Sequence, residues 1–125
     1  MNKKILIVDD EPNILISLEF LMRREGFEIL VARDGEEALQ SIRAHRPDLV
    51  LLDIMMPRIN GFEVCRQVRA DPALSGTRIV MLSAKGRPAQ IAEGLALGAD
   101  GYITKPFSTK NLVAQVKSLL GLDET

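Results

Sequence analysis

Short apolar runs alternate with amphipathic stretches along this chain, and this alternation limits its possible folds more than any other feature. Four runs rich in branched aliphatic residues cover residues 4–8, 29–32, 49–53 and 78–83, and a weaker fifth run covers residues 101–104. The runs are too short for helices, and they lack the alternating pattern of a strand that is exposed on one face. They are typical of strands buried on both faces, as in a parallel sheet covered by helices.

Stretches with helical periodicity separate these runs. We predict helices over residues 13–25, 35–45, 61–70 and 88–97, and a last helix that Ser108 caps and Gly121 ends. Strands that alternate with helices form a parallel sheet with right-handed crossovers and helices on both faces. Five such units in 125 residues predict an open, doubly wound α/β sheet, because a closed barrel of this type typically needs about 250 residues.

Composition and charge exclude several classes of protein. Hydrophobic residues make up 46% of the chain and charged residues 26%, which is ordinary for a globular domain and unlike a disordered chain. The net charge of −1 gives no sign of nucleic-acid binding. The apolar run that follows Lys4 ends at Asp9, which is too short for a signal peptide, and no stretch reaches the roughly 18 residues of a membrane helix. We therefore expect one cytoplasmic domain over residues 1–125, with no membrane contact and no direct contact with nucleic acid.

Polar side chains stand where the predicted strands end. Asp9 and Asp10 follow the first strand, Asp53 ends the third, Ser83 ends the fourth, and Lys105 follows the fifth. Ligands of open α/β sheets bind outside the carboxyl ends of the strands. We therefore expect these side chains to converge on one shallow crevice.

Three carboxylates and one ammonium group suggest a specific chemistry. Oxygen ligands favour a hard cation, and Mg²⁺ is the better choice because it leaves coordination positions for phosphate oxygens. Asp9 and Asp10 would ligate the ion directly or through water. Asp53 could be a third ligand, or it could be a nucleophile that accepts a phosphoryl group. Lys105 and the Ser83 hydroxyl would then contact phosphoryl oxygens.

Four motifs together resemble the receiver domain of two-component response regulators, the family that includes the chemotaxis regulators. They are Asp9-Asp10, the segment Leu-Leu-Asp-Ile-Met-Met-Pro of residues 51–57 leading to Gly61, Ser83-Ala84, and Lys105-Pro106-Phe107. Each motif is common by itself, but the four occur in order and each stands at a predicted strand end. The resemblance covers essentially the whole chain. It implies a flavodoxin-like, five-stranded parallel sheet of order 2-1-3-4-5 with five helices on both faces.

The resemblance implies a phosphoacceptor and a metal site. Asp53 would accept the phosphoryl group. Asp9, Asp10 and Asp53 would hold Mg²⁺ together with the backbone carbonyl of Met55. The chain would receive its phosphoryl group from a sensor histidine kinase or a histidine phosphotransfer protein.

The resemblance also implies a conformational switch. Ser83 would be the switch hydroxyl, Lys105 would pair with a phosphoryl oxygen, and Tyr102 would be the aromatic side chain that turns inward when Ser83 moves. The peptide bond between Lys105 and Pro106 is expected to be cis, as is usual in the family.

The face built from the fourth helix, fifth strand and fifth helix would transmit the change. We expect it to bind an unknown output protein or an effector that follows in a longer regulator, and the chain to be a monomer or a phosphorylation-dependent dimer through this face. No output domain follows in the 125 residues, so the chain would be either free-standing or part of a longer regulator. The side chains expected on this face are mostly charged: Lys85, Arg87, Gln90, Glu93, Tyr102 and Lys110.

Two other functions are kept as alternatives. A Mg²⁺-dependent phosphohydrolase would use Asp53 as a catalytic nucleophile, but no second general acid lies near it in the sequence and no insertion could form a lid. An interaction module that does not depend on phosphorylation would be expected to have lost site residues, and this chain retains them. The preferred interpretation is a signalling switch that is an enzyme only toward its own phosphorylation and dephosphorylation. We also predict slow autodephosphorylation, because Met55 and Lys85 would hinder the attacking water.

Overall fold

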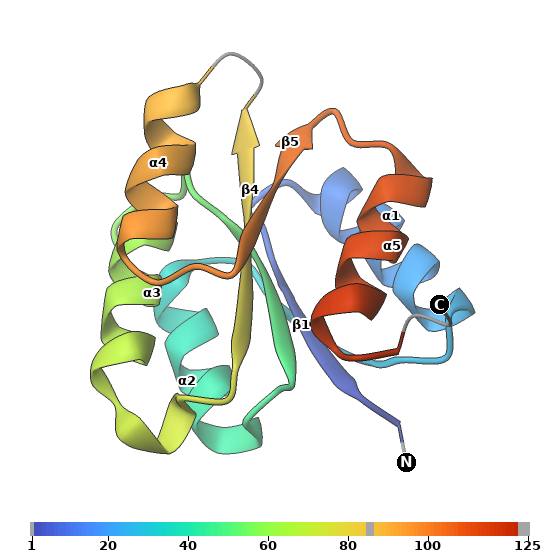
Figure 1. The fold of residues 1–125 in the computed structure, drawn as a ribbon, viewed down its shortest axis with the longest axis horizontal. Helices are drawn as coiled ribbons and strands as arrows, with labels where there is room; N and C mark the ends of the chain where they lie inside the picture. Colours follow the sequence, from blue (N-terminus) through green and yellow to red (C-terminus); the bar gives the residue numbers. More distant parts are fainter. Residues whose placement is uncertain (1, 85–86, 123–125) are drawn as a thin grey trace.

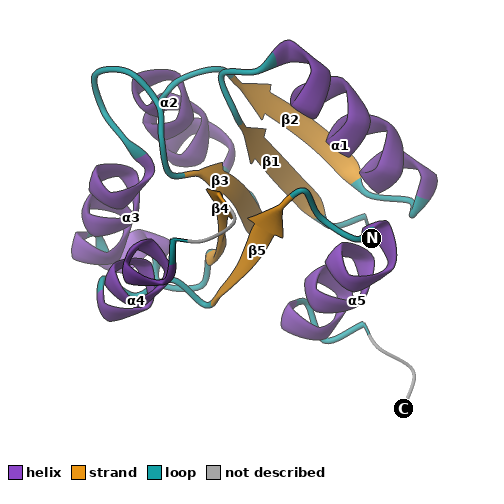
Figure 2. Cartoon of the chain, turned by 90° about the horizontal axis from the view of Figure 1, so that it is seen from above, coloured by secondary structure: helices purple, strands orange, loops and turns teal. Residues whose placement is uncertain are grey.

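The computed structural model describes residues 2–84 and 87–122, and it contains one parallel sheet between two layers of helices (Figures 1 and 2). The sheet has five strands in the order β2-β1-β3-β4-β5. Their bounds are Lys4–Val8 for β1, Glu28–Ala32 for β2, Leu49–Asp53 for β3, Arg78–Ala84 for β4 and Gly101–Lys105 for β5. The predicted fold and strand order are confirmed.

Five α-helices connect or follow the strands, as predicted. They are α1 (Pro12–Arg24), α2 (Gly35–His45), α3 (Gly61–Ala70), α4 (Pro88–Ala96) and α5 (Thr109–Leu119). Helices α1 and α5 cover one face of the sheet, and α2, α3 and α4 cover the other (Figure 2). None of the described helices has the length and apolar character needed to cross a bilayer.

Local signals explain the helix ends. The predicted cap is present, since the Ser108 side chain accepts a hydrogen bond from the backbone of Asn111 at the start of α5. Asp34 and Asn60 cap α2 and α3 in the same way. Such caps satisfy amide groups that have no partner within the helix. A short 3₁₀ helix, η1 (Pro72–Leu74), follows α3 and is absent from the sequence-based prediction.

The hydrophobic core has two parts because the central strands are buried on both faces. Leu6 and Leu52 pack with α2 and α3, whereas Ile7 and Leu51 pack with α1 and α5. All four side chains have no exposed surface. Burying an aliphatic side chain of this size contributes roughly 1.5–3 kcal/mol, so β1 and β3 form a rigid support for the residues at their carboxyl ends.

Candidate functional site

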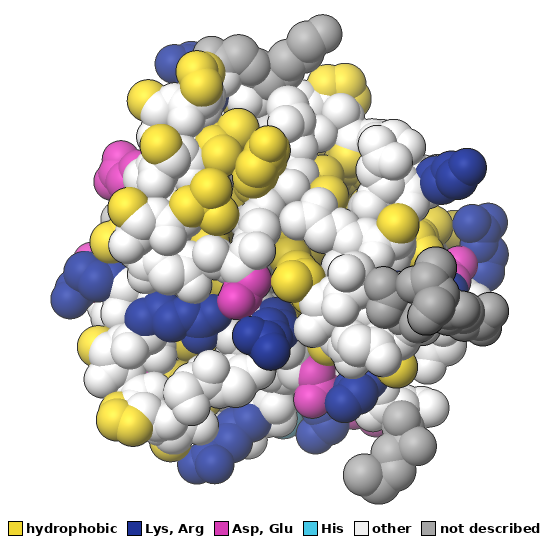
Figure 3. All heavy atoms as spheres, in the orientation of Figure 1, with side chains coloured by type: hydrophobic (Ala, Val, Ile, Leu, Met, Phe, Trp, Pro, Cys, Tyr) yellow, Lys and Arg dark blue, Asp and Glu magenta, His cyan; other side chains and the backbone are white. Residues whose placement is uncertain are grey.

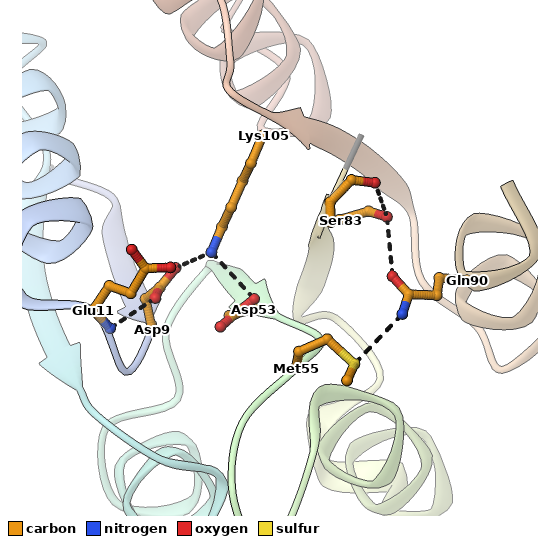
Figure 4. Close-up of polar contacts among 8 residues, drawn as sticks. Asp9, Glu11, Asp53, Met55, Ser83, Gln90 and Lys105 are labelled. Carbon is orange, nitrogen blue, oxygen red and sulfur yellow. Dashed lines mark hydrogen bonds and ion pairs between the residues drawn. The ribbon is translucent and has the colours of Figure 1, made fainter. Parts of the chain in front are cut away.

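The carboxyl ends of β1, β3, β4 and β5 bring four predicted site residues together (Figure 4). Asp9 directly follows β1, Asp53 ends β3, Ser83 lies near the end of β4, and Lys105 ends β5. Asp9, Asp53 and Ser83 are buried. The convergence expected from the strand ends is therefore present.

Lys105 joins the two buried carboxylates. Its Nζ donates to Oδ2 of Asp9 at 2.7 Å and to Oδ1 of Asp53 at 3.3 Å. Charge-assisted hydrogen bonds of this kind are stronger than those between neutral groups. The lysine therefore partly neutralises a pair of carboxylates that would otherwise repel each other.

Asp10 completes a group of three carboxylates. One oxygen from each of Asp9, Asp10 and Asp53 lies within 4.8 Å of the other two. Asp10 is exposed, whereas Asp9 is held in place because its Oδ1 accepts a hydrogen bond from the Glu11 backbone at 2.9 Å. An all-oxygen group that is open on one side suits a hard divalent cation.

The Ser83 hydroxyl lies toward α4 and away from Asp53 (Figure 4). It is within hydrogen-bond distance of the Ala84 carbonyl, at 3.3 Å, and of Oε1 of Gln90, at 3.4 Å. The amide nitrogen of Gln90 in turn donates to Sδ of Met55 at 3.4 Å. The sequence interpretation placed Gln90 on the surface of the fourth helix and missed its contacts with both residues.

Helix α4, strand β5 and helix α5 border an open groove of about 920 Å³. Leu95, Tyr102 and Phe107 are among its lining residues, and Asp100 is the charged residue among them. Hydrophobic side chains gather on this face over α4 and β5 (Figure 3). The groove is lined mainly by uncharged residues. Arg87, Glu93 and Lys110, which were expected on this face, are exposed outside its lining. Lys85, which was assigned to the same face, lies outside the described residues.

Comparison with known families identifies the domain. A sequence model described as the response regulator receiver domain matches residues 5–117. The chain belongs to this family.

Curated relatives and solved structures agree with this assignment. The DNA-binding response regulator MtrA of Mycolicibacterium smegmatis is 48% identical over 99% of this chain and 53% of its own length. The alkaline phosphatase synthesis transcriptional regulatory protein PhoP of Bacillus subtilis is 45% identical over 99% of this chain and 51% of its own length. This receiver domain therefore spans about half the length of these relatives.

Two solved structures show how closely the fold is shared. A putative response regulator from Chloroflexus aurantiacus has a TM-score of 0.93 and 37% identity, covering 97% of this chain and 99% of that one. The chemotaxis protein CheY4 of Vibrio cholerae has a TM-score of 0.88 and 33% identity, covering 95% of this chain and 99% of that one. These comparisons confirm the receiver-domain fold that the sequence resemblance implies.

Burial alters the acidity of the receiver's central carboxyl group. Desolvation, followed by the nearby charge of Asp9, raises the pKa of Asp53 to about 6, although the charge and hydrogen bond of Lys105 act in the opposite direction. Burial also disfavours the charged form of Lys105, but its hydrogen bond to Asp9 and the charge of Asp53 outweigh this, so its pKa is raised. The ammonium group therefore remains charged at neutral pH.

The raised pKa of Asp53 predicts that ionisation of this group costs stability. With a pKa of about 6 when folded and about 4 when unfolded, the group binds its proton more tightly in the folded chain. The stability that this tighter proton binding gives the folded chain is fully present below about pH 4, and it is lost as the pH rises through about 6. Without divalent cations, we expect Asp53→Asn to be about 2–3 kcal/mol more stable than the unmodified chain near pH 7.5, and no more stable near pH 4. Urea unfolding measures this, and a stability gain independent of pH would contradict it.

The remaining predicted positions agree with the structure in part. The peptide bond between Lys105 and Pro106 is cis, as expected. Tyr102 lies on β5 with 42% of its surface exposed, so it is turned outward in this arrangement. Met55 is 63% exposed beside the site, and the role of its backbone carbonyl remains a prediction.

Proposed function

We propose that residues 1–125 form one receiver domain that accepts a phosphoryl group on Asp53. The donor would be a phosphohistidine on a sensor kinase or on a phosphotransfer protein in the cytoplasm. The observation that carries this proposal is the position of Lys105, which lies between Asp9 and Asp53 with Asp10 close by. Apart from its own phosphorylation and dephosphorylation, the domain would not be an enzyme.

The carboxylates fit a bound Mg²⁺. Asp9, Asp10 and Asp53 would hold the ion together with the backbone carbonyl of Met55. When bound, Mg²⁺ would neutralise charge on the phosphoryl oxygens. The three acidic side chains present in one small group support this assignment.

The chain's own residues account for the transfer. An oxygen of Asp53 would attack phosphorus as the phosphorus–nitrogen bond to the donor histidine breaks, which gives an acyl phosphate. Lys105 would pair with the transferred group and offset its negative charge. The Ser83 hydroxyl would donate to a phosphoryl oxygen after leaving its present position beside Gln90.

This movement would shift the population between two arrangements of the α4-β5-α5 face. Tyr102 would fill the space that Ser83 vacates, and a partner that prefers the new arrangement would stabilise it. The apolar groove on this face supports binding of protein: an output protein, an attached effector or a second copy of the chain. The net charge of −1 supports the view that the receiver itself does not bind nucleic acid.

The decisive experiment measures intact mass after incubation with acetyl phosphate. We expect one phosphoryl adduct that requires both Mg²⁺ and Asp53, with Asp53→Ala as the control. Folded protein with no adduct at early times and no stable beryllofluoride complex would contradict the proposal and favour an interaction module. Continuous hydrolysis of small phosphomonoesters would instead favour a phosphohydrolase.

Met55 is expected to slow loss of the phosphoryl group. Its largely exposed apolar side chain stands two residues after Asp53, where it would hinder a water molecule approaching the acyl phosphate. We expect Met55→Asn to shorten the phosphoryl lifetime about tenfold, which corresponds to about 1.4 kcal/mol of activation free energy. Timed mass measurements after removal of acetyl phosphate test this.

The matched control for this prediction is Met55→Leu, which keeps an apolar side chain of similar size. Its lifetime should stay close to that of the unmodified chain. Equal lifetimes for Met55→Asn and Met55→Leu would show that Met55 does not restrict the water.

A further inference from the structure

Gln90 connects the switch hydroxyl to α4. It lies in the first turn of this helix, and its side-chain oxygen is 3.4 Å from the Ser83 hydroxyl. Its amide nitrogen donates to Sδ of Met55, also at 3.4 Å. Because the nitrogen is engaged by Met55, the oxygen faces Ser83 (Figure 4).

The hydroxyl of Ser83 has one hydrogen to donate. Among the described residues it lies within hydrogen-bond distance of two acceptors, the Ala84 carbonyl and Oε1 of Gln90. The same hydrogen cannot bind a phosphoryl oxygen on Asp53 while it is donated to either of these groups, and Gln90 is the one of the two whose acceptor a side-chain substitution removes. Gln90 therefore competes directly with the phosphoryl group for the switch hydroxyl.

Most residues of helix α4 are exposed or half-buried. Within α4, which lies wholly in the described part of the chain, Gly94 is the one buried residue. The contact between Gln90 and Ser83 is a side-chain contact that ties the first turn of α4 to the end of β4. Loss of the contact would remove one tie between the start of α4 and the end of β4.

We propose that Gln90 is a positioning residue that holds the Ser83 hydroxyl in the resting arrangement and thereby sets the fraction of molecules in the active arrangement. The inference rests on the function proposed above for Asp53 and Ser83. A ligand that requires a minor arrangement binds more weakly in proportion to the population of that arrangement. Loss of the contact should therefore tighten binding of any phosphoryl mimic.

Beryllofluoride, which mimics the phosphoryl group, provides the test in the full chain with Mg²⁺. Binding is followed through the backbone amide resonances of Ser83 and Ala84 during titration. We expect Gln90→Ala to bind about three- to tenfold more tightly than the unmodified chain, which is the effect of one hydrogen bond. The same resonances of free Gln90→Ala should shift toward their positions in the beryllofluoride complex.

Three further variants separate the hydrogen bond from the general effects of substitution. Gln90→Met keeps the length of the side chain without an amide oxygen, and it should behave like Gln90→Ala. Gln90→Glu keeps an oxygen acceptor for Ser83, and it should not bind beryllofluoride more tightly than the unmodified chain. Ala92→Ser changes an exposed residue on the same helix and should leave the affinity unchanged.

A double-mutant cycle excludes a merely structural role. In a Ser83→Ala background there is no hydroxyl to hold, so Gln90→Ala should no longer change the affinity. An equal effect in both backgrounds, or no effect in the unmodified background, would overturn the inference. Failure of the unmodified chain to bind beryllofluoride is a different result, and it would overturn the proposed function together with this inference.

Discussion

Replacing Lys105 with methionine is expected to slow phosphorylation of Asp53 by acetyl phosphate about a hundredfold, while Mg²⁺ binds at least as tightly as before. The ammonium group lies 2.7 Å from Asp9 and 3.3 Å from Asp53, so it can offset charge that develops during transfer. Methionine has a similar length and no charge. Loss of the ammonium group of Lys105 should raise the activation free energy by roughly 3 kcal/mol, which corresponds to this change in rate.

The two measurements should change in different directions for an electrostatic reason. Lys105 pairs with Asp9 and Asp53, two of the carboxylates that would hold Mg²⁺. Removing one cation leaves these groups more strongly attractive to another. Loss of Lys105 also removes a charge that lowers the pKa of Asp53, so a larger fraction of this nucleophile is protonated near pH 7 when no metal is bound.

Lys110→Met is the matched control, because it removes the charge of an exposed lysine on α5. Initial rates of adduct formation and Mg²⁺ titrations by NMR should both match the unmodified chain. If Lys105→Met phosphorylated at the unmodified rate, the lysine would have no part in the transfer. If the variant lost both phosphorylation and Mg²⁺ binding, its role would be to maintain the structure of the site.

The order of the strands, the burial of the central strands and the bounds of β1 and β3 could be predicted from the apolar runs and the resemblance. The partial exposure of the edge strands β2 and β5 and the ends of β2, β4 and β5 could not. The pattern predicted a strand over residues 101–104, whereas β5 continues to Lys105, which pairs with Ala84. Likewise, β2 begins at Glu28 because Glu28 pairs with Lys4. Such extensions depend on hydrogen bonds to a neighbouring strand, and the hydrophobic pattern does not record them.

The same difference separates the parts of the site that could be predicted from those that could not. Asp9, Asp53 and Lys105 follow from their places at strand ends, because the topology brings those ends together. The role of Gln90 depends on the direction of one hydroxyl and on the orientation of one amide. Its spacing of seven residues from Ser83, in a turn that starts a helix at Pro88, is a weak signal by itself.

The second large effect is expected at Gly61, where alanine should destabilise the folded chain by about 3 kcal/mol. A Cβ atom here would press on the carbonyl oxygen of Asp53 and lie 2.9 Å from Cα of Ile54. Both neighbours are backbone atoms, so the clash cannot be relieved by turning a side chain. Either the start of α3 or the end of β3 must move.

The same close approach forms the loop beside the site. The Gly61 amide donates to the Ile54 carbonyl at 2.9 Å and closes the segment that carries Met55. A shift at Gly61 would therefore displace Asp53 and the Met55 backbone as well as weaken the fold. We expect Gly61→Ala to lower the urea midpoint and also to slow phosphorylation under conditions in which the variant is folded.

Gly76→Ala is the matched control for this prediction. No atom lies within 4 Å of the Cβ that it would add. Alanine restricts the unfolded chain more than glycine does, so this variant should be unchanged or slightly more stable. Equal urea midpoints for the two variants would show that the close approach at Gly61 is readily relaxed. A large difference with normal phosphorylation would show that the clash is absorbed by α3, while the end of β3 keeps Asp53 in place.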